Sequence, residues 1–415
     1  MKKNIPTLQA LTFLMAMVLL FSSCFKDDCR RTYKVYTPVY KKLKDLRAEV
    51  QSRSTQPVTN TGKLYIKGDW IFLNEVKKGI HIIDNSDPTH PVKTSFINIP
   101  GNIDMHVKGN ILYADLYSDL LAVDITDPAH INVTKYLTNA FPDKSSNPTT
   151  TNPDSISIIT DWLSRDTTVD CTGSLGRDLC LNCSVFSATQ FNSMSSGKAS
   201  TTGMAGSMAR FAAVSNYMYA VTSRDLNVID ISTEANPLFI KKQTIGWDIE
   251  TIFPYNNKLY IGSGSSMSVY SLQNPASPSQ LSWSGHWCSG DPVVADDNYA
   301  YVTLHEANVC GSKVNQLEIY DLSTPGTPAL IKTYLLTNPQ GLSKDGNLLF
   351  ICDDGLKVYD ASQAADIKLI SHLPIAGSYD VIANNGIAYV VSKDGLYQYD
   401  YSNPQRIRLL SKLLK

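Results

Sequence analysis

The sequence has almost no excess of charge of either sign. Its 415 residues contain 37 Lys and Arg against 38 Asp and Glu, which leaves a formal net charge of −1. Its basic clusters do not exceed short runs such as Lys41-Lys42. Because nucleic-acid binding needs a concentrated basic face, this composition argues against a nucleic-acid partner.

The sequence also has no nucleophile elbow, no phosphate-binding loop and no metalloprotease helix. Enzyme classes built on these motifs are therefore excluded. Enzymes that gather scattered residues around a channel mouth stay possible, because they carry no short motif. No residue pattern implies a cofactor.

Only one stretch is strongly apolar, and it is too short to span a membrane. Residues 10–21 are apolar apart from Thr12 and follow Lys2 and Lys3. A spanning helix needs about 20 apolar residues, so this stretch predicts the hydrophobic region of a signal peptide. Its end, Phe21-Ser22-Ser23-Cys24, resembles the lipobox of bacterial lipoproteins. The resemblance implies that residues 1–23 are removed and that Cys24 is acylated; the alternative is an ordinary signal peptide.

The residues after Cys24 bear on location. Phe25-Lys26-Asp27-Asp28 is similar to the Lys followed by two acids that marks surface export of lipoproteins in the Bacteroidetes. The resemblance implies a lipid-anchored protein of the outer membrane that faces the cell exterior, with the periplasmic leaflet as the alternative. Several acyl chains on one cysteine would hold the protein at the membrane almost permanently.

Repeats dominate the remaining sequence. Apolar strands that end in a short polar residue recur about every 40 residues, with one longer interval after residue 124. Their last residues are Asp84, Asp124, Asp230, Ser271, Asp321, Asp360 and Asp400. A period of this size with four short strands per unit predicts an all-β, seven-bladed β-propeller of four-stranded antiparallel blades. We expect the recurrent Asp to accept backbone N–H groups in a turn, which is a structural role.

The repeats resemble a known family. Residues 225–232, Asp-Leu-Asn-Val-Ile-Asp-Ile-Ser, and residues 355–360, Gly-Leu-Lys-Val-Tyr-Asp, resemble the LVIVD repeat of bacterial and archaeal propellers. Residues 79–88, 99–104 and 110–115 resemble LVIVD lipoproteins of Bacteroidetes more narrowly. The resemblance covers residues 38–415 apart from an insert. It implies a propeller in the cell envelope, and it implies no reaction and no catalytic residue.

The predicted organisation has three parts. Residues 1–23 form the signal peptide, residues 24–60 a lipid-anchored tether, and residues 61–415 the propeller. Within the tether, Val39, Leu43, Leu46 and Val50 predict a short amphipathic helix over residues 39–53, which docks on the propeller. The long interval between repeats predicts an insert at about residues 138–207. It is rich in Ser, Thr and Asn, and is either a loop pinned by a disulfide or a lid or partner contact.

Strand order predicts where function lies. If the inner strand of each blade comes first, the loops after the second and fourth strands emerge on one face, the top face, which also carries the insert. Trp247 and Trp287 lie in such loops and are candidate contact residues. A candidate polar ring lies where inner strands begin: Asp104, Arg210, Asp248, Asp291, Gln340 and Asp380. This ring either holds a hard cation or, as we favour, bonds backbone N–H groups in turns, so no metal site is predicted.

The eight cysteines suit an oxidising compartment. Cys288 and Cys310 fall on the top of one blade and predict a disulfide. His286 and His305 nearby offer a zinc site as the alternative, but their spacing matches no common finger. The pairing of Cys29, Cys171, Cys180 and Cys183 stays open, and Cys352 is expected to be a buried small hydrophobe.

Two functions follow from these observations. The first is a non-catalytic binding or scaffold module for a protein partner or an extracellular ligand. The alternative is a hydrolase or lyase in which Asp104 acts with Asp291 or Asp380. Two carboxylates about 5–9 Å apart without backbone N–H partners would favour the enzyme. An apolar patch on the top face would favour a partner.

Overall fold

The computed structural model describes residues 30–145, 149–170, 194–195, 204–285, 289–290, 292–306, 314–324 and 326–415. The chain divides into two compact units, one of residues Met1–Val39 with Asp161–Gln190 and the other of residues Tyr40–Thr160 with Phe191–Lys415. None of the helices in these ranges has the length and apolarity of a membrane-spanning helix. The predicted signal peptide and Cys24 lie outside the described residues.

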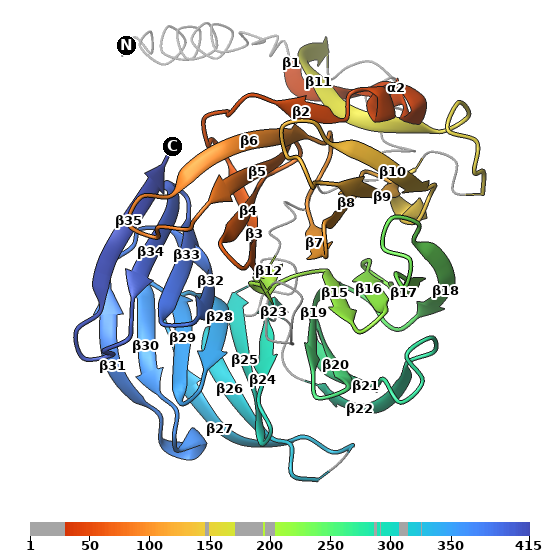
Figure 1. Cartoon of the computed structure of the whole chain (residues 1–415). Coiled ribbons are helices and arrows are strands. Elements are labelled where there is room, and N and C mark those ends of the chain that lie inside the picture. Colours follow the sequence, from red (N-terminus) through yellow and green to blue (C-terminus); the bar gives the residue numbers. More distant parts are fainter. Residues whose placement is uncertain are drawn as a thin grey trace, which may run out of the picture. The chain divides into compact units, whose positions relative to one another are not determined.

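Seven antiparallel sheets surround one axis in the larger unit (Figure 1). Blade 1 consists of β3 (Thr61–Lys67), β4 (Trp70–Glu75), β5 (Gly79–Asp84) and β6 (Val92–Asn98). Blade 2 consists of β7 (Met105–Lys108), β8 (Ile111–Leu116), β9 (Asp119–Asp124) and β10 (Asn132–Leu137). Blade 3 consists of β15 (Phe211–Val214), β16 (Tyr217–Val221), β17 (Asp225–Asp230) and β18 (Leu238–Thr244). The first strand of each blade faces the axis, as predicted, and the all-β seven-bladed propeller is confirmed.

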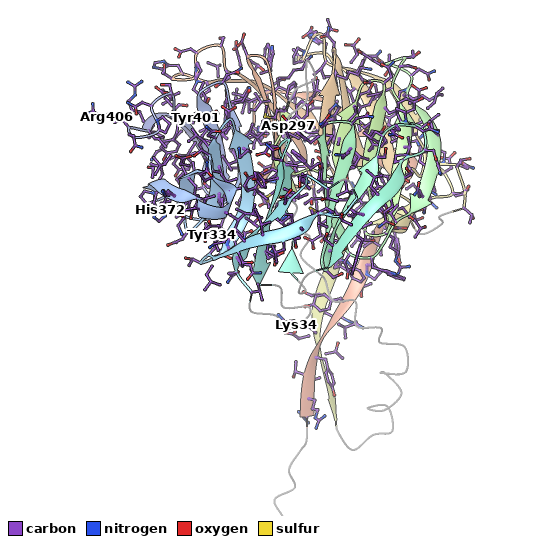
Figure 2. All side chains as sticks on the ribbon, turned by 90° about the horizontal axis from the view of Figure 1, so that it is seen from below. Lys34, Asp297, Tyr334, His372, Tyr401 and Arg406 are labelled. Carbon is purple, nitrogen blue, oxygen red and sulfur yellow. The ribbon has the colours of Figure 1, made fainter. Side chains whose placement is uncertain are left out.

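Blades 4 to 7 repeat this order. They consist of β19 (Ile249–Tyr255), β20 (Lys258–Ser263), β21 (Ser266–Ser271) and β22 (Ser279–Gly285); β24 (Val293–Ala295), β25 (Tyr299–Glu306), β26 (Gln316–Asp321) and β27 (Ala329–Leu335); β28 (Pro339–Asp345), β29 (Leu348–Asp353), β30 (Leu356–Asp360) and β31 (Lys368–Leu373); and β32 (Ser378–Asn384), β33 (Ile387–Ser392), β34 (Gly395–Asp400) and β35 (Arg408–Leu414). The short β23 (Ser289–Gly290) pairs with the far end of β25, and η2 (Ala364–Asp366) follows β30. Side chains fill the spaces between these sheets, and Arg406 and His372 project from the outer side (Figure 2).

The third strand of every blade ends in the predicted turn. Asp84 Oδ1 accepts a hydrogen bond from the backbone N–H of Ser86, two residues on, at 2.9 Å. Asp124, Asp230, Asp321, Asp360 and Asp400 accept the equivalent bond. In blade 4 the hydroxyl of Ser271 accepts it from Gln273 N at 3.2 Å. Hydrogen bonds from the residue two positions on lower the pKa of the Asp carboxyls, which agrees with a structural role.

Blades 7 and 1 meet where the ring closes, and among the described strands none of blade 7 pairs within the sheet of blade 1. An apolar cluster joins them, with Leu64, Ile66 and Ile71 of blade 1 packed on Ile382 and Val391 of blade 7. We call this junction the seam. Hydrogen bonds also cross it, from Thr61 Oγ1 to Ser392 O at 2.7 Å, from Gln398 Nε2 to Asn85 Oδ1 at 2.6 Å and from Ser411 Oγ to Pro88 O at 2.8 Å. The Tyr379 hydroxyl also donates to the carbonyls of Thr61 and Gly62.

The predicted helix over residues 39–53 is wrong in extent. The structure has a six-residue helix, α2 (Leu43–Ala48), between β1 (Arg30–Lys42) and β2 (Gln51–Arg53). Strand pairing overrides the helical periodicity at both ends, because β1 pairs with β11 (Ser157–Asp170) and β2 pairs with β6 of blade 1. Leu43 and Leu46 are buried in the core of blades 1 and 2, so the helix docks as expected.

The end of the predicted insert lies inside the ring. After η1 (Pro142–Lys144) and β11, three two-residue strands follow: β12 (Met194–Ser195), β13 (Met204–Ala205) and β14 (Ser207–Met208). β13 pairs with the inner strand β3, while β12 and β14 pair with each other and contact the inner strands β19, β28 and β32. Figure 1 shows β12 at the centre of the ring. We call residues 204–208 the plug.

Candidate functional site

Asp104 of the predicted polar ring is buried, and both of its carboxylate oxygens accept hydrogen bonds. It is 3% exposed, and its Oδ1 accepts the N–H of Met105 at 2.7 Å. Its Oδ2 accepts Lys63 Nζ at 2.9 Å and the backbone N–H of Arg210 at 2.5 Å. The Arg210 guanidinium donates to the carbonyls of Ile249 and Glu250 at 3.2 and 3.3 Å. Burial lowers the pKa of Lys63 and of Arg210, so both cations depend on these partners.

Asp380 serves a different purpose, because it holds the plug. It is 1% exposed, and its Oδ1 accepts the backbone N–H of Ser207 at 3.0 Å, the Ser207 hydroxyl at 3.3 Å and the N–H of Val381 at 2.9 Å. The N–H of Leu342 in blade 6 donates to the same hydroxyl. Ser207 therefore ties the plug to blades 6 and 7.

The two other ring candidates that the structure describes, Asp248 and Gln340, do not join these contacts. Asp248 is exposed and has a left-handed backbone with φ 49°. Gln340 accepts a bond from Thr303 Oγ1 through its backbone carbonyl at 2.7 Å. Asp291, Trp287, Cys288, Cys310 and His286 lie outside the described residues. Across the ranges that the structure describes, no group of three His, Cys, Asp or Glu side chains could hold a metal ion.

A cavity of about 550 Å³ opens on the top face, lined by loops of blades 1, 2 and 3 together with the insert. We call it the top pocket. Its aromatic side chains are Tyr40, Tyr117, Phe141 and Phe211, and its charged side chains are Lys77, Asp104, Asp115, Asp143, Lys144 and Arg210. Its volume lies within the usual range for small-molecule sites.

Asp115, like Asp104, has its carboxylate matched by protein donors. Asp115 Oδ1 accepts the N–H groups of Ile103 and Asp104 at 2.7 and 2.9 Å, and Oδ2 accepts Lys144 Nζ at 2.8 Å. Phe141 and Phe211 stack on each other with ring centroids 5.6 Å apart. Sequence reasoning found Asp104 and Arg210 but missed Tyr117, Phe141 and Lys144, since these residues occupy a turn and an insert that follow no repeat pattern.

Trp247 is a surface residue, as the sequence predicts for a contact residue of the top face. Its side chain is 66% exposed, and the guanidinium of Arg224 lies 3.7 Å from its ring centroid. Arg224 follows Thr222 and Ser223, which line the top pocket. Arg224 therefore links the loop that forms the pocket wall to Trp247, which lies in the connection between β18 and β19.

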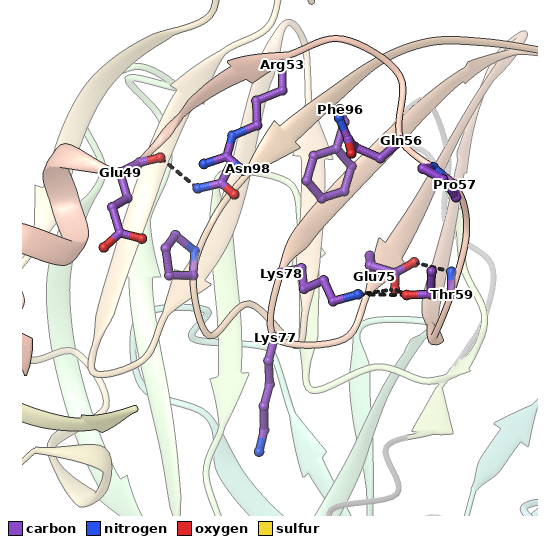
Figure 3. Close-up of a pocket in the computed structure, with 11 residues that line it drawn as sticks. Glu49, Arg53, Gln56, Pro57, Thr59, Glu75, Lys77, Lys78, Phe96 and Asn98 are labelled. Carbon is purple, nitrogen blue, oxygen red and sulfur yellow. Dashed lines mark hydrogen bonds and ion pairs between the residues drawn. The ribbon is translucent and has the colours of Figure 1, made fainter. Parts of the chain in front are cut away.

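A second hollow of about 370 Å³ lies on blade 1 (Figure 3). Thr59, Lys78 and Glu75 converge there: Glu75 accepts the N–H of Thr59 at 2.9 Å, the N–H of Asn60 at 2.7 Å and Lys78 Nζ at 3.1 Å. Burial alone would raise the pKa of Glu75, but the bonds from Thr59, Lys78 and His81 outweigh it and bring the pKa to about 2. This network fastens residues 59–60 to blade 1, so we assign it a structural role.

Three segments of the chain match the model of the LVIVD repeat, namely residues 60–97, 103–138 and 205–243. The chain contains LVIVD repeats. They coincide with blades 1, 2 and 3, whose loops line the top pocket. No curated protein matches the sequence.

Solved structures of similar fold share little sequence with this chain. The computationally designed Ika8 protein is 10% identical, with a TM-score of 0.52 over 86% of this chain and 88% of that protein. The periplasmic gluconolactonase PpgL of Pseudomonas aeruginosa is 10% identical, with a TM-score of 0.49 over 88% of this chain and 95% of its own. BamB from Moraxella catarrhalis is 10% identical, with a TM-score of 0.47 over 88% and 97%. At this identity the similarity concerns the fold alone.

Proposed function

We propose that this LVIVD-repeat propeller is a non-catalytic binding module of the cell envelope, which holds a protein partner or an extracellular ligand on its top face. One observation carries the proposal. Asp104 and Asp380, the two described carboxylates offered for acid–base chemistry, each accept two backbone N–H groups, whereas a large aromatic-lined pocket opens on the same face. Carboxylates fixed in this way hold chain segments together, and an open pocket with few free charges suits binding.

Location is part of the proposal and rests on sequence. Acylation at Cys24 would anchor the protein in the outer membrane, with the propeller at the cell surface. Labelled palmitate should enter the wild-type protein and not the Cys24→Ser variant, and protease added to intact cells should digest the wild type. Absence of label from the wild type would refute the anchor.

The binding role is tested with two exposed tryptophans. Trp247 lies on the top face, and Trp283 is 63% exposed on the outer strand β22, so it is a matched control. Replacement of either by Ala should leave the thermal midpoint near the wild-type value, because both rings face solvent. Full-length protein in detergent should capture a defined set of envelope components. Trp247→Ala should lose that set and Trp283→Ala should keep it; an identical set for all three proteins would contradict the proposal.

A disulfide between Cys288 and Cys310 is a further part of this proposal, motivated by their predicted positions on the top of one blade. Non-reducing peptide mapping of protein from the native envelope should recover the linked pair. Free thiols at both positions would refute the bridge, and bound zinc in the same sample would favour the metal site instead.

A further inference from the structure

We propose that the top pocket binds an uncharged saccharide, an inference that rests on the proposed binding function and names its ligand class. Three features of the pocket support it: two buried carboxylates that are each paired with a lysine, an adjacent donor and acceptor suited to hydroxyl groups, and an aromatic residue held in an unfavourable backbone conformation.

Two of the carboxylates in the pocket are already neutralised. Asp104 pairs with Lys63, and Asp115 pairs with Lys144. The side chains of Asp104 and Asp115 are only 4% and 3% exposed, so water screens them poorly. A charged group placed against these two pairs would meet no uncompensated opposite charge and would lose its hydration, which is costly. An uncharged ligand avoids that cost.

The Asp115–Lys144 pair offers a donor and an acceptor side by side. Asp115 Oδ1 takes its bonds from backbone and amide N–H groups, whereas Oδ2 takes only Lys144 Nζ among the contacts of the described residues. The ammonium has three N–H donors, and the side chain of Lys144 is 38% exposed. A hydroxyl group can donate to Asp115 Oδ2 and accept from Lys144 at once. The serine and threonine hydroxyls of Ser145, Ser157, Thr222 and Ser223 line the same pocket.

Tyr117 supplies an aromatic surface at a conformational cost. It occupies the first position of the two-residue turn between β8 and β9 with φ 51°, a left-handed conformation that bulky side chains disfavour. The structure also places its ring against Gly101: a Cβ at that position would lie 2.5 Å from Tyr117 Cδ2. A strained residue held in place by its surroundings is typical of ligand clamps. Sugar rings present apolar C–H faces that pack on such aromatic surfaces.

The same turn in blade 6 shows that an aromatic ring is not needed for the fold. Asp354 takes the equivalent position between β29 and β30 with φ 51°. Asn tolerates this conformation better than Tyr does. Tyr117→Asn should therefore remove the aromatic surface while the blade keeps its turn, and Asp354→Asn is the matched control.

The test titrates maltotriose, cellotriose, mannotriose and chitotriose into the wild type, Tyr117→Asn and Asp354→Asn by saturation-transfer NMR and calorimetry. We expect at least one of these saccharides to bind the wild type, Tyr117→Asn to weaken that binding at least tenfold, and Asp354→Asn to leave it unchanged. The thermal midpoint of Tyr117→Asn should stay within a few degrees of the wild type. Failure of all four saccharides to bind would overturn the inference, as would binding that Tyr117→Asn does not weaken or a preference for the anionic trigalacturonate.

A second measurement separates this inference from the proposed function. Tyr117→Asn enters the same capture experiment as Trp247→Ala. If no saccharide binds but capture still depends on Trp247, the saccharide inference falls and the binding module stands. If capture is also independent of Trp247, both fall.

Discussion

At the scale of single residues, buried carboxylates act as connectors between chain segments. Asp104 joins blade 2 to Lys63 of blade 1 and to the start of blade 3, and Asp380 joins blade 7 to the plug. Each bond satisfies a buried N–H group that would otherwise be costly, so the carboxylates stabilise the fold while their own charge is matched.

Glu75 gives a pH-dependent test of this role. Its pKa is about 2 in the fold against an ordinary value of 4.5, so its contribution to stability is fully present above pH 4.5 and is lost as the pH falls towards 2. Glu75→Gln should therefore have a lower thermal midpoint than the wild type at neutral pH, and the difference should shrink between pH 4.5 and 2. Thermal melts across this range measure it.

The control is Glu49→Gln, which removes an exposed carboxylate of the neighbouring segment that pairs with Lys41 on the surface. Exposed ion pairs contribute little to stability, so its midpoint should follow the wild type at every pH. A difference between Glu75→Gln and the wild type that stays constant from neutral pH to pH 2 would contradict the assigned role of Glu75.

At the scale of elements, local sequence patterns predicted the strands and turns of the blades. Contacts between residues far apart in sequence determine the extent of α2, the plug and the top pocket. The turn after Asp84 was predictable, because its carboxylate bonds a residue only two positions away. The extent of α2 was not, since its flanks pair with β11 and β6, far away in sequence. The plug escaped prediction for the same reason: nothing in residues 204–208 indicates that β3 and Asp380 receive them. The top pocket likewise depends on Tyr117 and Phe141 meeting in space.

The plug is tested by a double-mutant cycle on Asp380 and Ser207. Asp380→Ala leaves the buried Ser207 N–H without its acceptor, so we expect a loss of about 1–3 kcal/mol in the free energy of unfolding. Ser207→Ala keeps the bond from the backbone N–H of residue 207 to Asp380 but removes the acceptor of the buried Leu342 N–H, so we expect a loss of similar size. The double variant should show a coupling energy of about 0.5–3 kcal/mol in denaturant titrations. Additive effects would mean that the Ser207 hydroxyl does not couple to Asp380, and an unchanged stability of Asp380→Ala would mean that Asp380 does not hold the plug.

At the scale of the whole molecule, the seam differs from every other junction in the ring. Elsewhere the chain passes from the outer strand of one blade to the inner strand of the next, so neighbouring blades are covalently linked as well as packed. Blades 7 and 1 have no such covalent link: they are joined by side-chain contacts, namely the apolar cluster around Leu64 and Ile382 and hydrogen bonds, and by the plug, which pairs with β3 and bonds to Asp380. Local opening of the ring should therefore begin at the seam.

Two isoleucines on inner strands make this measurable. Ile382 on β32 belongs to the seam, and Ile252 on β19 lies in the ordinary junction of blades 3 and 4; both are at most 1% exposed. Either substitution by Ala removes the same groups and should cost about 2–5 kcal/mol in the free energy of unfolding. Hydrogen exchange distinguishes them. Ile382→Ala should accelerate exchange in β3 and β32 far more than Ile252→Ala does in β15 and β19, because no chain connection holds blades 7 and 1 together once their packing weakens. Equal acceleration at the two junctions would mean that non-covalent contacts close the ring as firmly as a covalent link does.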